Sequence, residues 1–531
     1  MILRIQVLLF AQLMLFVCCN RDQERERNFL KDASLSTSTK IQRYLESDTL
    51  MLSVFSKDET QFLRIYYSEE DYHPFLLEQE PSKDSLFRAL FTKSLAFGVP
   101  REYIHQNPKN AHPVEEDMVN VLNVARMIEI RENGFLDTSG RPATRVPLPD
   151  LKKMKTITDC RNFDAACRNL QTLGPVSDTA FLKLSNQIFA FGMQYELDSD
   201  TLSPKNFTTE SERLQLARKS LQQKGYLKSK KSSEMEFQKA LISFKLHNGL
   251  DSSLQLNNYA IEALCESNQS RLTRAALSLE KIRLNTLNYQ RLVLINLPEY
   301  ALYFYANDSL KAKHRIVIGK RENETPELTS EIRSIVVYPS WKVPASIVKK
   351  EIMPELRKNR GYLAKHHYTI RGLKDTSALN IHEINLKSNG YSIVQSPGKW
   401  NSLGVIKFEF NNSHSVYVHD TPQKGLFNRA VRSFSHGCMR CEYPLLLSKQ
   451  FLKYDQRGRK KNSMRPDTLD SLIRIGENTV LPLKTRIPIK VLYQTVIASS
   501  NQLVFFIDIY GRDALLLKGL SEVKPFTFVS I

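Results

Sequence analysis

The hydrophobic pattern of this chain changes its period at Tyr289, and that change limits the folds available to it. Before Tyr289, apolar residues recur at helical spacing, as they do from Glu116 to Ile130. After Tyr289, β-branched and aromatic residues gather in short runs bounded by turn residues, a pattern typical of strands. A chain of 531 residues is too long for one ordinary domain, and two to four are expected. The sequence therefore predicts a multidomain α+β protein whose helices come first.

Two helical units are expected before the change of period. Residues 39–197 are predicted to form a helical scaffold domain, and they contain no catalytic motif. A polar linker, Asp198 to Glu210, separates them from a compact unit at 211–268, whose three apolar stripes predict three short helices. Asn248-Gly249-Leu250 is typical of a helix C-terminus within that unit. An amphipathic helix from Arg271 to Asn285 then connects the helical units to the strands.

Eight apolar runs after Tyr289 predict a mostly-β domain over residues 289–531, large enough for a barrel or a sandwich. The runs are Leu292 to Leu297, Ala301 to Tyr305, Arg315 to Gly319, Ile332 to Tyr338, Val405 to Phe410, Val416 to His419, Ile487 to Tyr493 and Leu503 to Ile507. A mixed insertion, residues 345–402, precedes the runs that carry the reactive residues. We expect it to fold over the site as a cap.

The N-terminus carries the features of an export signal. Residues 1–19 combine one positive charge at Arg4 with an apolar core from Ile5 to Val17 that is too short to span a bilayer stably. The core ends in Cys18-Cys19, and a cysteine at that place resembles a bacterial lipoprotein signal with Cys19 as the lipidated residue. Cleavage as a soluble exported protein and retention as an uncleaved anchor are the alternatives. The expected location is the bacterial periplasm or cell envelope, with membrane association through the leader or a lipid.

The formal net charge of +19 would suggest nucleic acid as the partner of a cytosolic protein. The basic residues are spread along the chain and no nucleic-acid motif accompanies them, so nucleic acid is not expected to bind. A surface attracted to an anionic polymer or to the cell envelope fits the charge, and so does a merely soluble basic surface.

The chain has seven cysteines, and two of them belong to the leader. The other five are too few for a fold built on disulfides in a protein of this size. Cys160 and Cys167 either pair across the short loop between them or are ordinary buried thiols, and the second reading is favoured.

Two short segments carry the residue types of a thiol enzyme. Val416 to Asp420 ends an alternating run, and Ser435 to Arg440 is a turn-like segment with a cysteine in it. A thiol needs a nearby base to become the nucleophilic thiolate, so Cys438 is the expected nucleophile and His419 the expected base. The ion pair formed in this way would lower the effective pKa of the thiol. Either the backbone carbonyl or the side chain of Asp420 is the candidate for holding the other imidazole nitrogen.

The residues around Cys438 suit an acyl substrate. Gly437 lets the backbone approach a substrate carbonyl, so the N–H of Cys438 and its neighbours are expected to form an oxyanion hole. Arg440 suits a substrate carboxylate, which its guanidinium grips with two parallel hydrogen bonds. Three further residues are expected to line the pocket: Ser435, His436 and Tyr417.

Cys438 and Cys441 also form a Cys-x-x-Cys pair, which is a pattern of zinc sites and of redox dithiols. His436 and His419 would complete a ligand set. However, no second cysteine pair and no thioredoxin-like strand–helix context accompany the motif, so neither a metal nor a redox activity is expected. Cys441 either protects the nucleophile reversibly as a disulfide or has no role.

Together these segments resemble the catalytic domain of the L,D-transpeptidase family, in particular its large exported members with a helical scaffold and a peptidoglycan-binding-like module. Beyond Ser435 to Arg440, the resemblance is carried by Val293 to Pro298, Val317 to Lys320, Thr325-Pro326, Pro339 to Pro344, Leu403 to Phe408, Tyr417 to Pro422 and Asp508 to Asp513. Phe237 to Leu250 gives the unit at 211–268 its similarity to a peptidoglycan-binding module. Asp251-Ser252-Ser253 stands there in place of the usual Asp-Gly.

The resemblance implies an enzyme that uses the tetrapeptide stems of peptidoglycan as both donor and acceptor. The cysteine would attack the carbonyl of the third stem residue and release the terminal D-alanine. The side-chain amine of a second stem would then resolve the thioester and form a 3–3 cross-link. The resemblance implies no metal or organic cofactor, and it implies acylation by carbapenems. The alternatives are an L,D-carboxypeptidase that resolves the thioester with water, and a non-catalytic protein that binds the cell wall.

Overall fold

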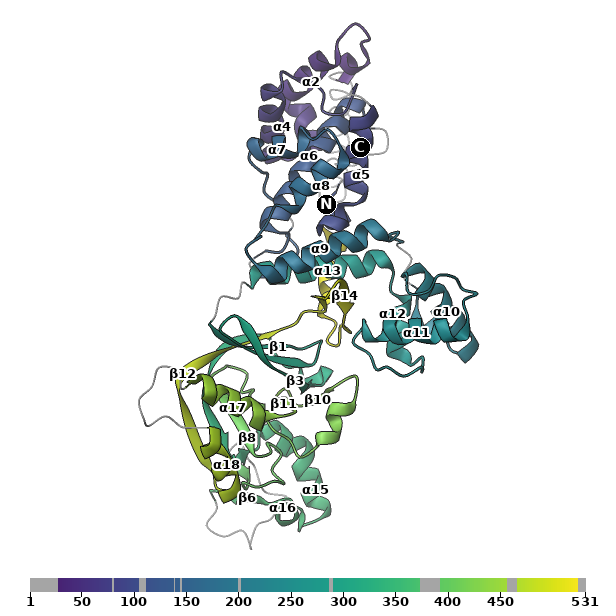
Figure 1. Cartoon of the computed structure of the whole chain (residues 1–531). Helices are drawn as coiled ribbons and strands as arrows, with labels where there is room; N and C mark the ends of the chain where they lie inside the picture. The colour runs from purple at the N-terminus through teal and green to yellow at the C-terminus, as the bar shows by residue number, and fades with distance from the viewer. Residues whose placement is uncertain are drawn as a thin grey trace, which may run out of the picture.

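The structure is a computed structural model that describes residues 27–78, 81–104, 111–137, 139–143, 146–198, 202–285, 290–372, 392–455 and 466–523. The predicted leader, residues 1–19, lies outside these ranges. Within them, no helix combines the length and the apolar character that crossing a membrane requires. Figure 1 shows a helical part, a small helical module beside it and a strand-rich part beneath, which confirms the predicted multidomain α+β class.

The helical scaffold consists of short helices around one long central helix. Its elements are η1 (Arg27–Lys31), α2 (Thr37–Glu46), α3 (Asp48–Val54), α4 (Lys57–Glu69), α5 (Pro81–Thr92), η2 (Ser94–Phe97), η3 (Arg101–Tyr103), α6 (Pro113–Asn133), α7 (Leu151–Thr158), α8 (Phe163–Gln171) and α9 (Thr179–Gln194). Local polar residues begin several of these helices. At α4, for example, Ser56 and Glu59 form a capping box that satisfies free backbone N–H groups.

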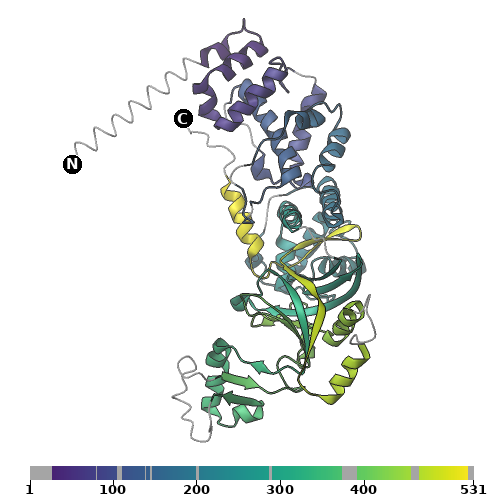
Figure 2. The ribbon, with the colours of Figure 1, turned by 90° about the vertical axis from the view of Figure 1, so that its left-hand side faces the viewer.

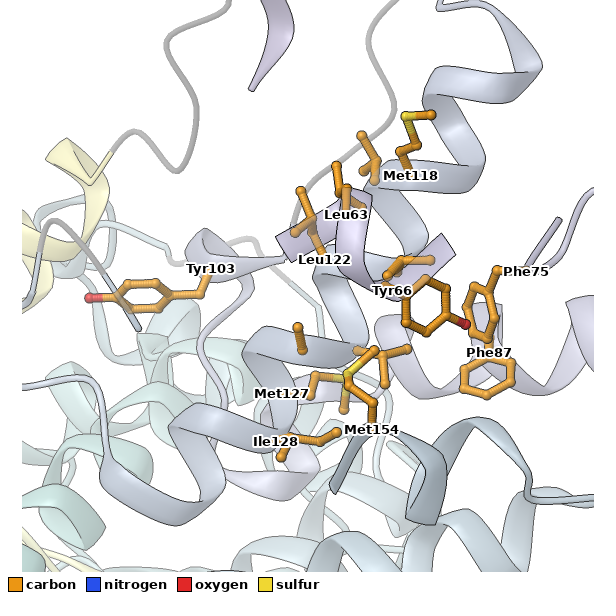
Figure 3. Close-up of a cluster of buried hydrophobic side chains, with 14 of the residues drawn as sticks. Leu63, Tyr66, Phe75, Phe87, Tyr103, Met118, Leu122, Met127, Ile128 and Met154 are labelled. Atoms are coloured by element: carbon orange, nitrogen blue, oxygen red, sulfur yellow. The ribbon is translucent and has the colours of Figure 1, made fainter. Parts of the chain in front are cut away.

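The central helix α6 is buried along most of its length. Figure 3 shows its side chains Met118, Leu122 and Ile128 packed among apolar residues of the neighbouring helices. Asp117 of α6 accepts three hydrogen bonds from the backbone N–H groups of residues 75–77, at 2.6–2.8 Å. A buried carboxylate that is satisfied in this way ties the loop before α5 to the core.

The small module consists of η4 (Pro204–Asn206), α10 (Glu210–Gln223), α11 (Glu234–Leu246) and α12 (Asn258–Cys265), around a core that includes Leu221, Phe237 and Phe244. Gly249 has a φ of 64°, which confirms the predicted C-terminus of a helix before it. The next helix, α13 (Asn268–Leu284), leaves the module and packs along α9 of the scaffold (Figure 1).

All eight runs predicted as strands contain strands. The main sheet consists of β1 (Arg291–Asn296), β2 (Ala301–Ala306), β3 (Ser309–Gly319), β4 (Leu328–Val337), β8 (Ile406–Phe410), β9 (Val418–His419), β10 (Ser433–Ser435), β11 (Met439–Cys441) and β12 (Thr479–Leu492), in the order β10-β3-β11-β9-β8-β4-β12-β1-β2. A further pairing of β2 with β3 closes the sheet into a barrel-like form. Two helices, α17 (Pro444–Asp455) and α18 (Pro466–Ile475), contribute apolar residues to its core.

The predicted cap insertion forms a small subdomain at the end of the molecule away from the scaffold (Figures 1 and 2). The insertion, residues 345–402, holds α14 (Ala345–Ile347), η6 (Val348–Ile352), α15 (Met353–Lys358), α16 (Tyr362–Lys365), β6 (Tyr368–Arg371) and β7 (Ser392–Gln395), and β5 (Trp341–Lys342) just before it joins its sheet. Its strands pair in the order β5-β7-β6, and Val348, Ile352 and Leu356 lie in its own apolar core. Residues 373–391 of the insertion lie outside the described ranges.

The chain returns to the scaffold after β12. The hairpin of β13 (Val496–Ser499) and β14 (Gln502–Phe505) does not join the main sheet. Its apolar residues, among them Leu503 and Phe505, pack against α9 and α13 instead. The last helix, α19 (Arg512–Glu522), places Leu520 in the scaffold core, and Figure 2 shows it beside the scaffold. The β13–β14 hairpin and α19 thus pack on the helices rather than on the main sheet.

Candidate active site

Neighbouring strands bring the two predicted catalytic segments together. In the parallel pair of β9 and β11, Met439 lies opposite Val418 and Arg440 lies opposite His419. Because side chains alternate along strands, Tyr417 and His419 share one face of the sheet with Cys438 and Arg440. Such strands lie about 4.8 Å apart. The fold therefore places the predicted thiol, imidazole and guanidinium on one surface.

The second cysteine of the pair points the other way. Met439 and Cys441 are fully buried in the core of the main sheet, on the face opposite Cys438. Cys438 and Cys441 are free thiols, and so are Cys160 and Cys167. Alternation along β11 explains why Cys441 is held away from the nucleophile, and it argues against the disulfide that sequence spacing allowed. No group of three or more metal-ligating side chains is present among the described residues.

His419 is buried, and its ring orientation is fixed by the backbone. Its Nδ1 lies within hydrogen-bonding distance of the Asp420 carbonyl oxygen, which can only accept. Nδ1 therefore carries the proton, and Nε2 keeps the lone pair that a base needs. The side chain of Asp420 is engaged elsewhere, because its carboxylate accepts from the Val405 N–H at 3.0 Å and pairs with Lys424. Of the two candidates in Asp420, the carbonyl orients the imidazole.

The protonation states at the site favour a neutral pair. Burial, with the nearby charge of Arg440, lowers the pKa of His419 to about 3. Burial also raises the pKa of the Cys438 thiol. The structure thus differs from the ion pair expected from the sequence, because a water-poor site disfavours both charged forms. A neutral imidazole beside a protonated thiol is an arrangement suited to general-base catalysis, in which the base takes the thiol proton as the sulfur attacks.

We expect this low pKa to shape the pH dependence of acylation. His419 accepts a proton only when it is neutral, so acylation should stay nearly constant from pH 7 to pH 5 and decline only toward the folded-state value of about 3. Stopped-flow acylation by a carbapenem across this range measures the effect, with circular dichroism as a check on folding. An unfolded histidine titrates near 6.5, so this histidine favours the folded state above that pH and progressively less below it. An acid limb centred at pH 6–7 in folded protein would contradict the buried, neutral imidazole.

The loop before Cys438 is shaped by hydrogen bonds within it. The hydroxyl of Ser435 donates to the carbonyl of Cys438 and accepts from the N–H of Gly437 at 3.1 Å. Gly437 has a φ of 111°, a left-handed conformation that favours glycine. Among the described residues, the Cys438 N–H donates to no protein group. Ser435 and Gly437 thus shape a loop in which the backbone N–H of Cys438 is left without an acceptor in the described part of the protein.

Tyr417, which the sequence predicts to line the pocket, lies beside His419. Its ring centroid is 5.5 Å from that of His419. Burial, with the neighbouring Cys438, raises the pKa of the Tyr417 hydroxyl well above its usual range. The hydroxyl therefore keeps its proton at neutral pH and is available as a hydrogen-bond donor beside the thiol.

Arg440 and His436 border the site in different ways. One terminal nitrogen of Arg440 donates to the Gln423 side chain at 2.6 Å, while its Nε is buried and has no partner among the described residues. That buried donor is therefore left unsatisfied by the described residues. His436, in contrast, contacts Glu351 of η6 through its Nε2. It therefore joins the catalytic loop to the cap.

Two residues at the site were not assigned from the sequence. Lys407 of β8 lies opposite His419 in the antiparallel register, and its ammonium group is 4.7 Å from the centre of the Tyr417 ring. Besides burial, its charge contributes to the pKa values of His419 and Cys438. Glu351 belongs to the cap. The alternation of Ile-Lys-Phe-Glu-Phe in β8 is a signal that could have placed Lys407 on the polar face.

The chain is similar in sequence to known proteins. Residues 290–455 match the family model described as YkuD, the L,D-transpeptidase catalytic domain. A Haemophilus influenzae protein described as "Putative L,D-transpeptidase" is 27% identical over 263 residues, which are 49% of this chain and 51% of that protein. The chain thus spans about half the length of this curated relative.

A solved structure, the L,D-transpeptidase from Mycobacterium smegmatis, aligns at 12% identity over 38% of this chain and 58% of that one. Its TM-score is 0.19, so this likeness carries no argument. The family match covers β1 to α17 and includes both His419 and Cys438. Residues 290–455 of this chain therefore match the catalytic domain of the YkuD L,D-transpeptidase family.

Proposed function

We propose that the protein is a peptidoglycan L,D-transpeptidase that forms 3–3 cross-links through a thioester on Cys438. The observation that carries this proposal is the shared sheet face of Cys438 and His419, with the Nε2 of His419 left as the basic nitrogen. A thiol beside a neutral, oriented imidazole is suited to acyl transfer in two half-reactions.

The first half-reaction forms the thioester. The Cys438 sulfur attacks the carbonyl of the third stem residue while His419 takes the thiol proton. The oxygen of the tetrahedral intermediate becomes negative, and the Cys438 N–H and the Tyr417 hydroxyl are the donors that stabilise it. Each such donor contributes roughly 3 kcal/mol to the transition state. His419 then gives its proton to the departing nitrogen of D-alanine, and the thioester remains.

The second half-reaction consumes the thioester. The side-chain amine of an acceptor stem attacks the carbonyl, and His419 removes a proton from that amine. The thiolate leaves and recovers its proton, so the enzyme returns to its initial state. The guanidinium of Arg440, a residue that is only partly buried, is the proposed donor for a carboxylate of the stem peptide. This function requires an exported protein, as the leader at residues 1–19 predicts.

One incubation separates this function from its two alternatives. The purified full chain is mixed with a disaccharide-tetrapeptide, and the products are read by mass spectrometry. We expect cross-linked dimers together with free D-alanine. Tripeptide without dimers would replace the proposal by an L,D-carboxypeptidase, since water would be resolving the thioester. An unchanged substrate would favour a non-catalytic protein that binds the cell wall. The matched control is the Cys438→Ala chain, which should give no product.

A further inference from the structure

A buried threonine outside the cysteine and histidine segments makes a hydrogen bond to the loop that precedes Cys438. Thr325 follows η5 (Arg321–Asn323) and is fully buried. Its hydroxyl donates a hydrogen bond to the backbone carbonyl of Gly437 at 2.8 Å. The same oxygen accepts a hydrogen bond from the N–H of Gly319, at the end of β3, at 2.9 Å. One side chain therefore joins the sheet to the loop that carries Cys438.

The carbonyl of Gly437 and the N–H of Cys438 belong to the same peptide unit. That unit is planar and trans, so its C=O and N–H point in opposite directions, and fixing one fixes the other. Thr325 holds the C=O on the buried side. The N–H must then point away from Thr325, and it has no acceptor among the described residues.

We infer that Thr325 is a positioning residue, whose hydroxyl orients the Gly437–Cys438 peptide and so aims the oxyanion donor. The inference rests on the proposed function, because such a donor matters only where an acyl carbonyl is attacked. A hydrogen bond to the carbonyl also polarises the peptide, which makes its N–H a stronger donor. Glycine at 437 has little steric resistance to rotation of its peptide, so the orientation needs an external bond.

Tyr510 fixes Thr325 in turn. Its hydroxyl accepts from the Thr325 N–H at 3.1 Å and donates to the Gly319 carbonyl at 2.7 Å. The backbones are too close for any other residue at 319. A Cβ there would lie 2.0 Å from the carbonyl oxygen of Asn323 and 3.0 Å from the Cα of Gly437. Three backbone segments thus meet around two hydroxyl groups, with little room for the loop to adjust if one is lost.

The segment that carries Tyr510 is fastened to the scaffold. Asp513, three residues further on, is 1% exposed and forms ion pairs with Lys281 of α13 at 2.7 Å and with Arg274 of α13 at 3.7 Å. Burial alone would raise the pKa of Asp513, but these two cations outweigh it and lower the pKa. The carboxylate is therefore charged and held by the scaffold helix.

Arg512 connects the segment of Tyr510 to the residues around Thr325. It pairs with Glu324 and Glu327, each at 2.8 Å, and these residues flank Thr325 in the sequence. Its guanidinium also lies over the Tyr510 ring, 5.3 Å from the ring centre. Residues 508–513, which we call the C-terminal strut, thus link α13, which packs along the scaffold, to the peptide that precedes Cys438.

A pair of substitutions at one position tests the role of Thr325. Thr325→Val keeps the shape and removes the hydroxyl, whereas Thr325→Ser keeps the hydroxyl. The probe is a carbapenem, and stopped-flow kinetics separate its reversible binding from the first-order acylation step. We expect Thr325→Val to slow acylation by about 10- to 1,000-fold, the upper end being the cost of losing an oxyanion donor. Binding should change by less than about 3-fold, and Thr325→Ser should stay within about 5-fold of the wild type for acylation.

A spectroscopic signal separates orientation of the donor from general damage to the fold. A weaker hydrogen bond to the acyl carbonyl raises its infrared stretching frequency, so the Thr325→Val acyl-enzyme should absorb at a higher frequency than the wild type. Tyr510→Phe keeps the ring and removes the hydroxyl. It should slow acylation and raise the carbonyl frequency, as Thr325→Val does, but by smaller amounts. It replaces Thr325→Val as the test variant if Thr325→Val does not fold.

Three results would overturn the inference. One is an unchanged acylation constant in folded Thr325→Val, or in folded Tyr510→Phe if that is the variant measured. A second is a Thr325→Ser chain as slow as Thr325→Val. A third is wild-type protein that forms no acyl-enzyme at all, which would also remove the proposed function. In the first two cases the wild type still acylates, so the proposed function stands while the role of Thr325 fails.

Discussion

Replacing Cys438 by alanine is expected to abolish acyl-enzyme formation while the chain stays folded. In the proposed mechanism the sulfur is the atom that carries the acyl group, and loss of a nucleophile typically costs about 10⁴-fold or more in rate. Cys438 is only partly buried, so losing one sulfur atom should lower the free energy of unfolding by about 1 kcal/mol or less. Intact-mass measurement after incubation with a carbapenem reads acylation directly, and thermal denaturation reads stability.

Cys441→Ala is the matched control, because it makes the same chemical change three residues away. Cys441 lies in the core of the sheet and faces away from the site. We expect this variant to acylate at a rate near that of the wild type, but to lose about 1–2 kcal/mol of stability through the cavity left in the core. If Cys438→Ala still gained the mass of the carbapenem, or if Cys441→Ala lost acylation in folded protein, the assignment of the nucleophile would be wrong.

Replacing His419 by alanine is expected to have the second large effect on the rate of acylation. Without the base, the thiol must ionise unaided, and burial raises its pKa, so little thiolate is present at neutral pH. We expect acylation to slow by about 10²–10⁴-fold at pH 7, the range typical of general-base catalysis. The rate of the variant should rise with pH, because hydroxide replaces the missing base. Stopped-flow acylation at several pH values measures both effects.

His314→Gln serves as the control for losing a buried histidine. His314 is on β3, is 6% exposed and has no hydrogen-bond partner for either ring nitrogen among the described residues. It lies outside the face that carries Cys438, so its replacement should leave acylation nearly unchanged. An unchanged acylation rate in folded His419→Ala protein would contradict the assignment and transfer the role of base to His436, the other histidine beside the cysteine.

The secondary-structure elements could be predicted from the sequence, and the segments that hold Cys438 and His419 could be singled out, because their signals are local. Runs such as Leu292 to Leu297 are apolar, β-branched and bounded by turns, and the cysteine segment is continuous. The contacts made by Thr325 are of another kind. Its partner Gly437 is 112 residues away, and only the order and register of the strands bring the two together. No periodicity along the chain encodes such a contact.

Other differences between the sequence-based predictions and the structure also have physical causes. Which group of Asp420 holds His419 depended on where its carboxylate finds donors, and these are the Val405 N–H and Lys424. The neutral state of the thiol and imidazole depends on burial, which a linear sequence does not report. β14 was predicted as a strand, but whether a strand joins the main sheet depends on the surface that covers its apolar face. Here that surface belongs to α9 and α13.

The return of the chain to the scaffold after β12 has a mechanical consequence. A domain on a single linker can turn about that linker, and relative motion is then the default expectation. The catalytic sheet of this protein is instead attached at two points, through α13 before β1 and through the β13–β14 hairpin and α19 after β12. Buried ion pairs of Asp513 hold the second point. Twisting the sheet against the helices would strain these ion pairs, so we expect the scaffold and the loop that holds Cys438 to move together.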